Sequence, residues 1–234
     1  MKRQLASGLF TLLAAFLMVS TPVTVLGQDR LTLDDGSTIQ YFLALPDDAD
    51  RNGGSGASPL AVFMGGGSGN APISYTVFRF YARELAALGW AVAVPISPDN
   101  RSFRGANGDR VRQLIAFLQQ RDDISTGKTL LAGISAGGMS ALELAGRFPG
   151  ETLGVMAVPA LARDGAYLEN LSGLPIYLRI GSADELGWGA EFDATVATLE
   201  QAGAILDAEL LYGQPHMFGL DWDRVATWLN SLEQ

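Results

Sequence analysis

Three side chains in this sequence have the types and the order that nucleophilic catalysis requires. Ser135 stands in a Gly-Ile-Ser-Ala-Gly pentapeptide, Asp184 follows an apolar run, and His216 is the only histidine among 234 residues. A serine hydroxyl attacks a carbonyl carbon when a neighbouring base accepts its proton, and imidazole has a pKa suited to this near neutral pH. The sequence therefore predicts Ser135 as the nucleophile, His216 as the base and Asp184 as the carboxylate that orients the imidazole.

The sequence leaves one alternative for the carboxylate that orients the imidazole. Asp184 lies in Gly-Ser-Ala-Asp-Glu, directly after a predicted strand, where an orienting carboxylate is expected. Glu185 is its immediate neighbour, and Asp164 follows the preceding predicted strand. The position at a strand end favours Asp184, and Asp164 stays the rival.

A glycine-rich segment, Gly-Gly-Gly-Ser-Gly at 65–69, follows the apolar run Leu60 to Met64. Acyl transfer needs two backbone N–H donors for the oxyanion that forms on the carbonyl oxygen. Ala136, which follows the serine, is the expected source of one donor, and Gly66 or Gly67 the source of the other. No Gly-Lys-Ser/Thr follows this segment, so it does not match a phosphate-binding loop.

Other chemistry finds less support in the sequence. One histidine, no cysteine and no clustered carboxylate motif give no metal site, and we expect no cofactor. Four apolar side chains are candidates to line a substrate pocket, although each also suits the core: Tyr75, Phe103, Trp188 and Met217.

Six short apolar runs alternate with helical patterns along the chain. Runs of this length, bounded by Gly or Pro, are typical of strands buried on both faces of a parallel sheet. The predicted strands are Leu60 to Met64, Trp90 to Pro95, Thr129 to Ile134, Leu153 to Val158, Ile176 to Ile180 and Ile205 to Tyr212. The predicted helices are Ser74 to Leu88, Asp109 to Gln120, Ala136 to Phe148, Ala190 to Ala202 and Leu220 to Leu232.

This alternation predicts a doubly wound, mostly parallel α/β sheet in a single domain, residues 28–234. An antiparallel hairpin, Arg30 to Ile39 with Gln40 to Leu45, is expected before it and turns at Asp-Asp-Gly. Ligands on such sheets bind beyond the carboxyl ends of the strands. Ser135, Asp184 and the glycine-rich segment all fall at that edge.

The N-terminal residues and the charge bear on location and partners. Lys2 and Arg3 precede an apolar stretch, Leu9 to Val19, and Val-Leu-Gly precedes Gln28, which predicts a signal peptide at 1–27 and an exported protein, periplasmic or secreted. The apolar stretch is shorter than the ~20 residues of a spanning helix, although a retained anchor is the alternative. A net charge of −9 argues against nucleic acid or an anionic membrane as the partner. Nothing in the sequence indicates the oligomeric state.

Four segments together resemble an α/β-hydrolase over roughly residues 30 to 234: the glycine-rich turn, Gly-Ile-Ser-Ala-Gly-Gly, Gly-Ser-Ala-Asp and Pro-His-Met. Ser-Ala-Gly-Gly-Met and the small size resemble the dienelactone-hydrolase-like and the polyhydroxybutyrate-depolymerase or feruloyl-esterase-like branches. The chain departs from these patterns at two positions. Met64 stands where many members have His, and Ser135 stands where dienelactone hydrolases proper have Cys.

The resemblance implies hydrolysis of a small or polymer-borne carboxylic ester in two steps, through an acyl-enzyme on Ser135. Only 16 residues, Ala160 to Pro175, separate the two strands between which lids are usually inserted, so we expect no substantial cap and an open site. A serine peptidase or amidase would use the same triad, and an acyltransferase the same intermediate. A non-catalytic exported binding protein is a further alternative, because fold does not determine function.

Overall fold

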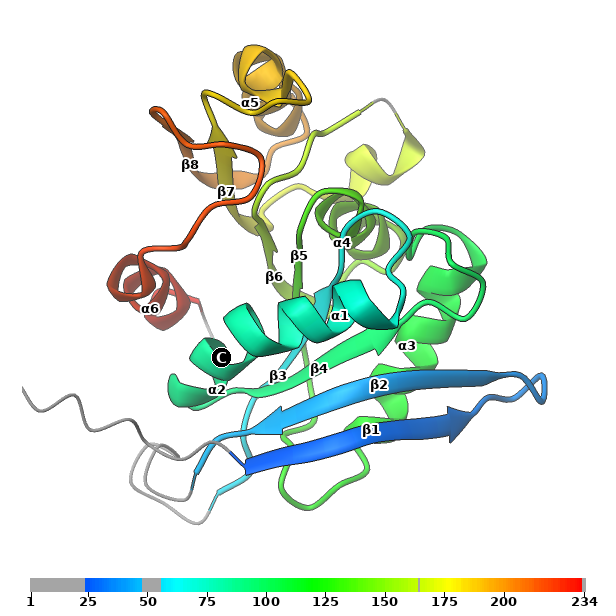
Figure 1. Cartoon of the computed structure of the whole chain (residues 1–234). Coiled ribbons are helices and arrows are strands. Elements are labelled where there is room, and N and C mark those ends of the chain that lie inside the picture. Colours follow the sequence, from blue (N-terminus) through cyan, green and yellow to red (C-terminus); the bar gives the residue numbers. More distant parts are fainter. Residues whose placement is uncertain (1–23, 48–55, 164, 233–234) are drawn as a thin grey trace, which may run out of the picture.

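The computed structural model describes residues 24–47, 56–163 and 165–232, which form one eight-stranded sheet with helices on both faces (Figure 1). The strand order is β1-β2-β4-β3-β5-β6-β7-β8. Most of the predicted signal peptide lies outside the described residues, and its expected cleavage point before Gln28 falls within β1. Among the described residues, no helix has the length and apolar character needed to cross a bilayer.

The sheet is parallel except at its N-terminal edge. β2 pairs antiparallel with both β1 and β4, and the pairs from β4 through β3 to β8 are parallel. The strands are β1 Thr24–Thr32, β2 Thr38–Leu45, β3 Leu60–Met64, β4 Ala91–Ile96, β5 Thr129–Gly133, β6 Thr152–Ala157, β7 Pro175–Gly181 and β8 Ile205–Leu211. The prediction of a mostly parallel α/β sheet with an N-terminal antiparallel hairpin is confirmed.

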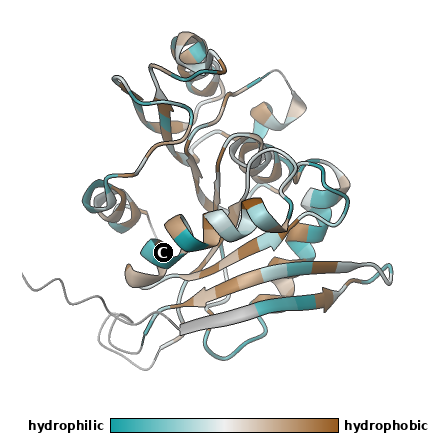
Figure 2. Cartoon of the chain, in the orientation of Figure 1, coloured by the Kyte–Doolittle hydropathy of each residue, from teal (hydrophilic) through white to brown (hydrophobic). Residues whose placement is uncertain are grey.

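Side chains of successive strand residues enter opposite layers of the core. On β3, Val62 and Met64 belong to one apolar cluster, and Ala61 and Phe63 belong to the other. Helices α3, α4 and α5 cover the first cluster, and α1, α2 and α6 cover the second. Figure 2 shows apolar residues along the central strands and polar residues over the outer surfaces of the helices. Burial on both faces explains why these strands read as continuous apolar runs.

The helices follow the predicted order, and the main differences concern the first helix. They are α1 Ala71–Val77, η1 Phe78–Ala82, α2 Arg83–Ala87, α3 Ala106–Leu118, α4 Ala136–Arg147, η2 Ala166–Asn170, η3 Trp188–Glu191, α5 Phe192–Gln201 and α6 Trp222–Asn230. The predicted helix Ser74 to Leu88 is three consecutive segments, because η1 is a turn of π-helix between α1 and α2. It also begins earlier than predicted, since the Asn70 side chain caps it by accepting from the backbone N–H of Ile73 at 3.2 Å.

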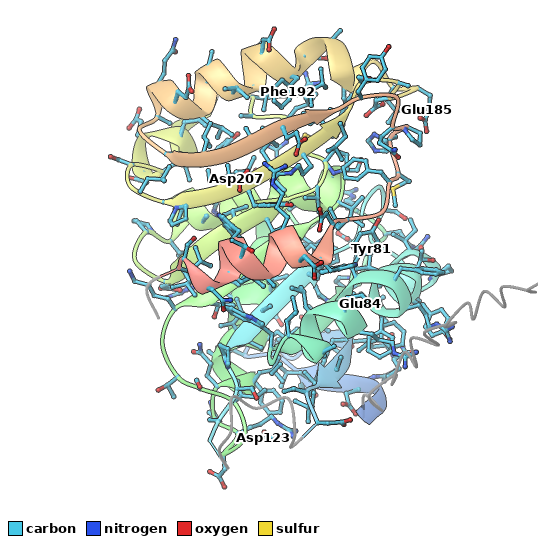
Figure 3. All side chains as sticks on the ribbon, turned by 90° about the vertical axis from the view of Figure 1, so that its left-hand side faces the viewer. Tyr81, Glu84, Asp123, Glu185, Phe192 and Asp207 are labelled. Carbon is cyan, nitrogen blue, oxygen red and sulfur yellow. The ribbon has the colours of Figure 1, made fainter. Side chains whose placement is uncertain are left out.

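A buried arginine joins the last two strands. The guanidinium of Arg179 donates to the backbone oxygen of Asp207 at 2.6 Å and to its Oδ1 at 2.8 Å, and it lies 3.6 Å from the ring centroid of Tyr177. Arg224 of α6 also pairs with Asp207 and Glu209. Figure 3 shows Asp207 beside α6. These contacts tie together β7, β8 and α6, the elements that flank the segment containing His216.

Replacing Arg179 by Met should destabilise the fold far more than the same change at Arg224. Arg179 is 1% exposed, so its loss removes a desolvated partner of two carboxylates, and we expect the free energy of unfolding to fall by about 3 kcal/mol. The Arg224 side chain is 45% exposed, so Arg224→Met should cost about 0.5–1 kcal/mol. Urea unfolding followed by tryptophan fluorescence measures both. Equal, small effects would contradict this account of the β7–β8 pairing.

Candidate active site

Ser135 occupies a strained turn between β5 and α4. Its backbone has φ 57° and ψ −121°, and it is one of two non-glycine residues with positive φ among those described. Such a conformation costs free energy, so neighbouring contacts must hold it. The Ser135 N–H donates to the backbone oxygen of Pro159 at 2.7 Å, and the Ile134 N–H donates to that of Met64 at 3.2 Å. The turn is therefore fixed to the last residue of β3 and to the segment that follows β6.

Glycine at 133 and 137 allows helix α4 to approach the sheet this closely. A Cβ at Gly137 would overlap the backbone oxygen of Met64, and a Cβ at Gly133 would overlap the backbone of Gly137. Any larger residue at either position would push α4 away from the strand ends. The close approach leaves the half-buried Ser135 at the N-terminal end of a 12-residue helix.

Backbone donors lie beside Ser135. A Cβ built on Gly66 would lie 3.2 Å from the Cβ of Ser135, so the glycine-rich segment contacts the serine directly. Within the described part of the chain, the N–H groups of Gly66, Gly67 and Ala136 have no hydrogen-bond acceptor. The helix N-terminus adds a partial positive charge at the same place. Together these groups are suited to stabilise a negative charge that develops next to Ser135 Oγ.

Asp184 and His216 form a buried pair at the same edge of the sheet. Nδ1 of His216 lies 2.7 Å from Oδ2 of Asp184, and the two residues are 7% and 8% exposed. The other carboxylate oxygen of Asp184 accepts from the Leu186 N–H at 2.7 Å. Because Nδ1 contacts the carboxylate, Nε2 is the ring nitrogen left to exchange a proton. Among the described residues no hydrogen bond joins the imidazole to Ser135 Oγ, a contact that often tightens only when substrate binds.

The four pocket candidates lie in different surroundings. Trp188 packs its ring edge-on against the His216 imidazole, with centroids 4.9 Å apart. Phe103 is buried in the core against Gly69, whereas Tyr75 and Met217 are about half exposed. Asp164, the rival for the acid, lies outside the described residues. The described residues contain no group of three or more His, Cys, Asp or Glu placed to hold a metal ion.

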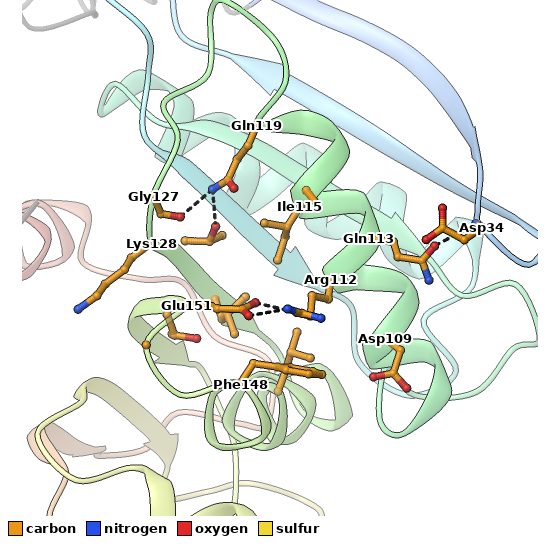
Figure 4. A pocket seen from close by; sticks show the side chains of 16 residues that line it. Asp34, Asp109, Arg112, Gln113, Ile115, Gln119, Gly127, Lys128, Phe148 and Glu151 are labelled. Atoms are coloured by element: carbon orange, nitrogen blue, oxygen red, sulfur yellow. Dashed lines mark hydrogen bonds and ion pairs between the residues drawn. The ribbon is translucent and has the colours of Figure 1, made fainter.

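One hollow in the described structure lies away from this site. It has a volume of about 700 Å³ and lies between α3 and α4, where Thr129 and Thr152 begin β5 and β6. Arg112 and Glu151 form a two-bond ion pair within it (Figure 4). The hydrogen bonds from Arg112 hold the pKa of Glu151 below its ordinary value. Since the hollow lies at the amino ends of the strands, it cannot deliver a substrate to Ser135 at the carboxyl ends.

Two contacts of the segment around His216 could not be predicted from the sequence. The Glu185 carboxylate accepts from the backbone N–H of His216 at 3.0 Å, and the Tyr81 hydroxyl donates to the backbone oxygen of Phe218 at 2.9 Å. In the sequence, Glu185 was visible only as a neighbour of Asp184. Tyr81 carried no signal, because 137 residues separate it from its partner.

No family model and no curated protein matches this sequence, but many solved structures are similar. A protein named as a dienelactone hydrolase from Klebsiella pneumoniae has 13% identity and a TM-score of 0.72, over 90% of this chain and 100% of its own. A thermostable esterase has 17% identity and a TM-score of 0.63, over 88% of this chain and 60% of its own. Dipeptidyl peptidase 4 from Porphyromonas gingivalis has 17% identity and a TM-score of 0.66, over 91% of this chain and 36% of its own.

The chain thus spans less than two thirds of the length of the last two proteins, so their whole activities do not transfer to it. At these identities the similarity concerns the arrangement of the backbone. It confirms the fold that the sequence motifs implied: this chain has the α/β-hydrolase fold and resembles esterases and a dienelactone hydrolase of that fold.

Proposed function

We propose that this protein is a serine hydrolase that cleaves carboxylic esters through an acyl-enzyme intermediate. The observation that carries the proposal is the buried contact of 2.7 Å between His216 and Asp184, at the sheet edge where Ser135 stands on its strained turn. A histidine paired in this way is an oriented base, and the strained turn presents a hydroxyl at the start of a helix.

In the first step, Ser135 Oγ bonds to the ester carbonyl carbon while Nε2 of His216 takes the hydroxyl proton. The carbonyl electron pair moves onto oxygen, and the N–H groups of Gly66 and Ala136 donate to this oxyanion. The intermediate then expels the alcohol, which receives the proton from the imidazolium. Water repeats the sequence on the acyl-enzyme, and a carboxylic acid leaves. Asp184 orients the imidazole and stabilises its charge throughout.

Loss of any member of the triad should abolish turnover of p-nitrophenyl butyrate. We expect Ser135→Ala and His216→Ala each to lower kcat about a thousandfold or more, and Asp184→Asn to lower it strongly as well, because the three groups act as one unit. Asp164→Asn should keep nearly full activity, because Asp184 is the carboxylate that contacts the His216 imidazole.

The outcomes separate the alternatives. Activity that survives both Ser135→Ala and His216→Ala would contradict the triad. Cleavage of peptide substrates without ester hydrolysis would indicate a peptidase, and a product that forms only with added alcohol would indicate an acyltransferase. Ligand binding by an inactive wild-type protein would indicate a binding protein.

The surroundings of the triad support accessible, short acyl esters as substrates. The segment between β6 and β7 contains the short η2 turn and no inserted domain. The loops that carry Asp184 and His216 expose large apolar side chains: Leu186 is 59% exposed, Tyr212 95% and Met217 47%. These three residues, which we name the apolar rim, lie open to solvent instead of under a cap. The loops that carry Asp184 and His216 therefore give a substrate little enclosure.

An open site predicts a flat preference for acyl length. Because methylenes beyond the rim stay in water, they cannot gain the ~0.8 kcal/mol that each buried methylene contributes. We expect kcat/KM for p-nitrophenyl acetate and butyrate to equal or exceed that for octanoate, and triglycerides with long chains to be poor substrates. A strong preference for long-chain triglyceride would show that the site encloses the acyl chain.

A further inference from the structure

The base of the proposed triad stands on a segment without regular secondary structure. This segment, which we name the His216 loop, runs from Tyr212 after β8 to Asp221 before α6. Gly213 has a positive φ of 71° within it, and Gly219 has open space around its Cα. A catalytic side chain must be held within about 0.5 Å of its working position, so contacts from outside the loop have to supply its rigidity.

One set of contacts comes from the turn after β7. Oε2 of Glu185 accepts from the backbone N–H of His216 at 3.0 Å, while the adjacent Asp184 binds the imidazole of the same residue. Figure 3 shows Glu185 at this turn, beside the His216 loop. The hydrogen bond from the His216 N–H lowers the pKa of Glu185, which favours the charged carboxylate. Two consecutive acidic residues therefore hold one histidine, by its backbone and by its ring.

Further hydrogen bonds join the start of the His216 loop to the turn after β7. The Ala183 N–H donates to the backbone oxygen of Gln214 at 2.9 Å, and the Gly213 N–H donates to Ser182 Oγ at 2.8 Å. These bonds fix the loop where it leaves β8. They do not reach past His216, so the part of the loop that returns to α6 needs a different anchor.

That anchor comes from the other side of the loop. The Tyr81 hydroxyl donates to the backbone oxygen of Phe218, two residues after His216, at 2.9 Å. Tyr81 is 7% exposed and packs against the rings of Phe63 and Trp222, with centroids 5.4 and 6.5 Å away. In Figure 3 it lies where the chain approaches α6. Tyr81 belongs to the π-helical turn η1, and π turns often mark functional positions because they redirect side chains.

We propose that Glu185 and Tyr81 are positioning residues that hold the His216 loop from opposite sides and so set the place of the imidazole relative to Ser135. The inference rests on the proposed function of His216 as the base. Asp184 alone fixes the orientation of the ring, but the ring can follow any movement of the loop backbone. Glu185 holds that backbone at His216 itself, and Tyr81 holds it just beyond.

Three variants test this arrangement. Tyr81→Phe removes only the hydroxyl, Glu185→Ala removes the acceptor, and Glu185→Gln keeps an oxygen that can accept the same N–H. Matched controls are Tyr41→Phe, at a buried tyrosine on β2, and Glu191→Ala, at an exposed carboxylate of η3. A displacement of about 1 Å costs up to ~100-fold in rate, so we expect kcat to fall about tenfold in Tyr81→Phe and in Glu185→Ala, with KM changed less than about threefold.

The conservative variant Glu185→Gln and the double variant distinguish a positioning role from a general effect on stability. Glu185→Gln should keep kcat within about threefold of wild type, and both controls should equal wild type. Because the two anchors hold one loop, the double variant should depart from the product of the single losses. Unchanged kcat in both single variants, with normal loss in Ser135→Ala, would overturn the positioning role and leave the proposed triad intact.

The imidazole can also be observed directly, because His216 is the only histidine in the chain. Labelling histidine with ¹⁵N gives one set of ring signals, and the Nδ1–H proton bonded to Asp184 should resonate at low field. We expect this signal to stay sharp in the wild type and in Glu185→Gln, and to broaden in Tyr81→Phe and Glu185→Ala at temperatures well below Tm. A signal that is equally sharp in every variant would overturn the inference, even if the wild type hydrolysed no ester.

Discussion

The backbone at Ser135 is held in a left-handed conformation, and the central part of the structure is arranged around that constraint. Such a conformation costs about 1–3 kcal/mol for a residue with a side chain. Hydrogen bonds from Ile134 to the end of β3 and from Ser135 to the segment after β6 offset this cost. Gly133 and Gly137 let α4 lie close to these strand ends. The same packing brings Gly66 against Ser135, so one constraint places the hydroxyl and its neighbouring N–H donors together.

The histidine is held by a different kind of structure. Ser135 is fixed within a strand-to-helix turn. His216 lies on an irregular loop that is restrained by contacts from neighbouring elements. The ion pairs of Arg179 and Arg224 with Asp207 secure β8 to β7 and to α6, the elements that flank that loop. Glu185 and Tyr81 then act on the loop itself. Stability and positioning are therefore separable in this protein. The stability of this region depends on the buried Arg179 and its partly exposed partners, and the positioning of His216 depends on two hydrogen bonds to its loop.

Much of the sheet and the order of the candidate catalytic residues could be predicted from the sequence, because apolar runs and short motifs are local features of the chain. The apolar run Leu60 to Met64 coincides with β3, and that of Thr129 to Ile134 exceeds β5 by one residue. Chain order and strand ends led the sequence to pair Asp184 with His216, and the two side chains are in contact in the structure; their catalytic roles stay a prediction. The π turn was missed because Phe78–Ala82 continues the periodicity of an ordinary helix. Phe103, considered for the pocket, lies in the core because Gly69, far from it in sequence, leaves space for its ring. Contacts of this kind depend on tertiary packing and leave no pattern along the chain.

Covalent labelling by an organophosphate, diethyl p-nitrophenyl phosphate, would show whether His216 activates Ser135. A serine that is activated by a histidine attacks phosphorus, expels p-nitrophenolate and keeps the diethylphosphoryl group, which intact mass and peptide mapping detect. We expect a single adduct on Ser135 in the wild type, and none in His216→Ala under the same conditions. An adduct at another residue, or equal labelling of Ser135 without His216, would contradict the proposed triad.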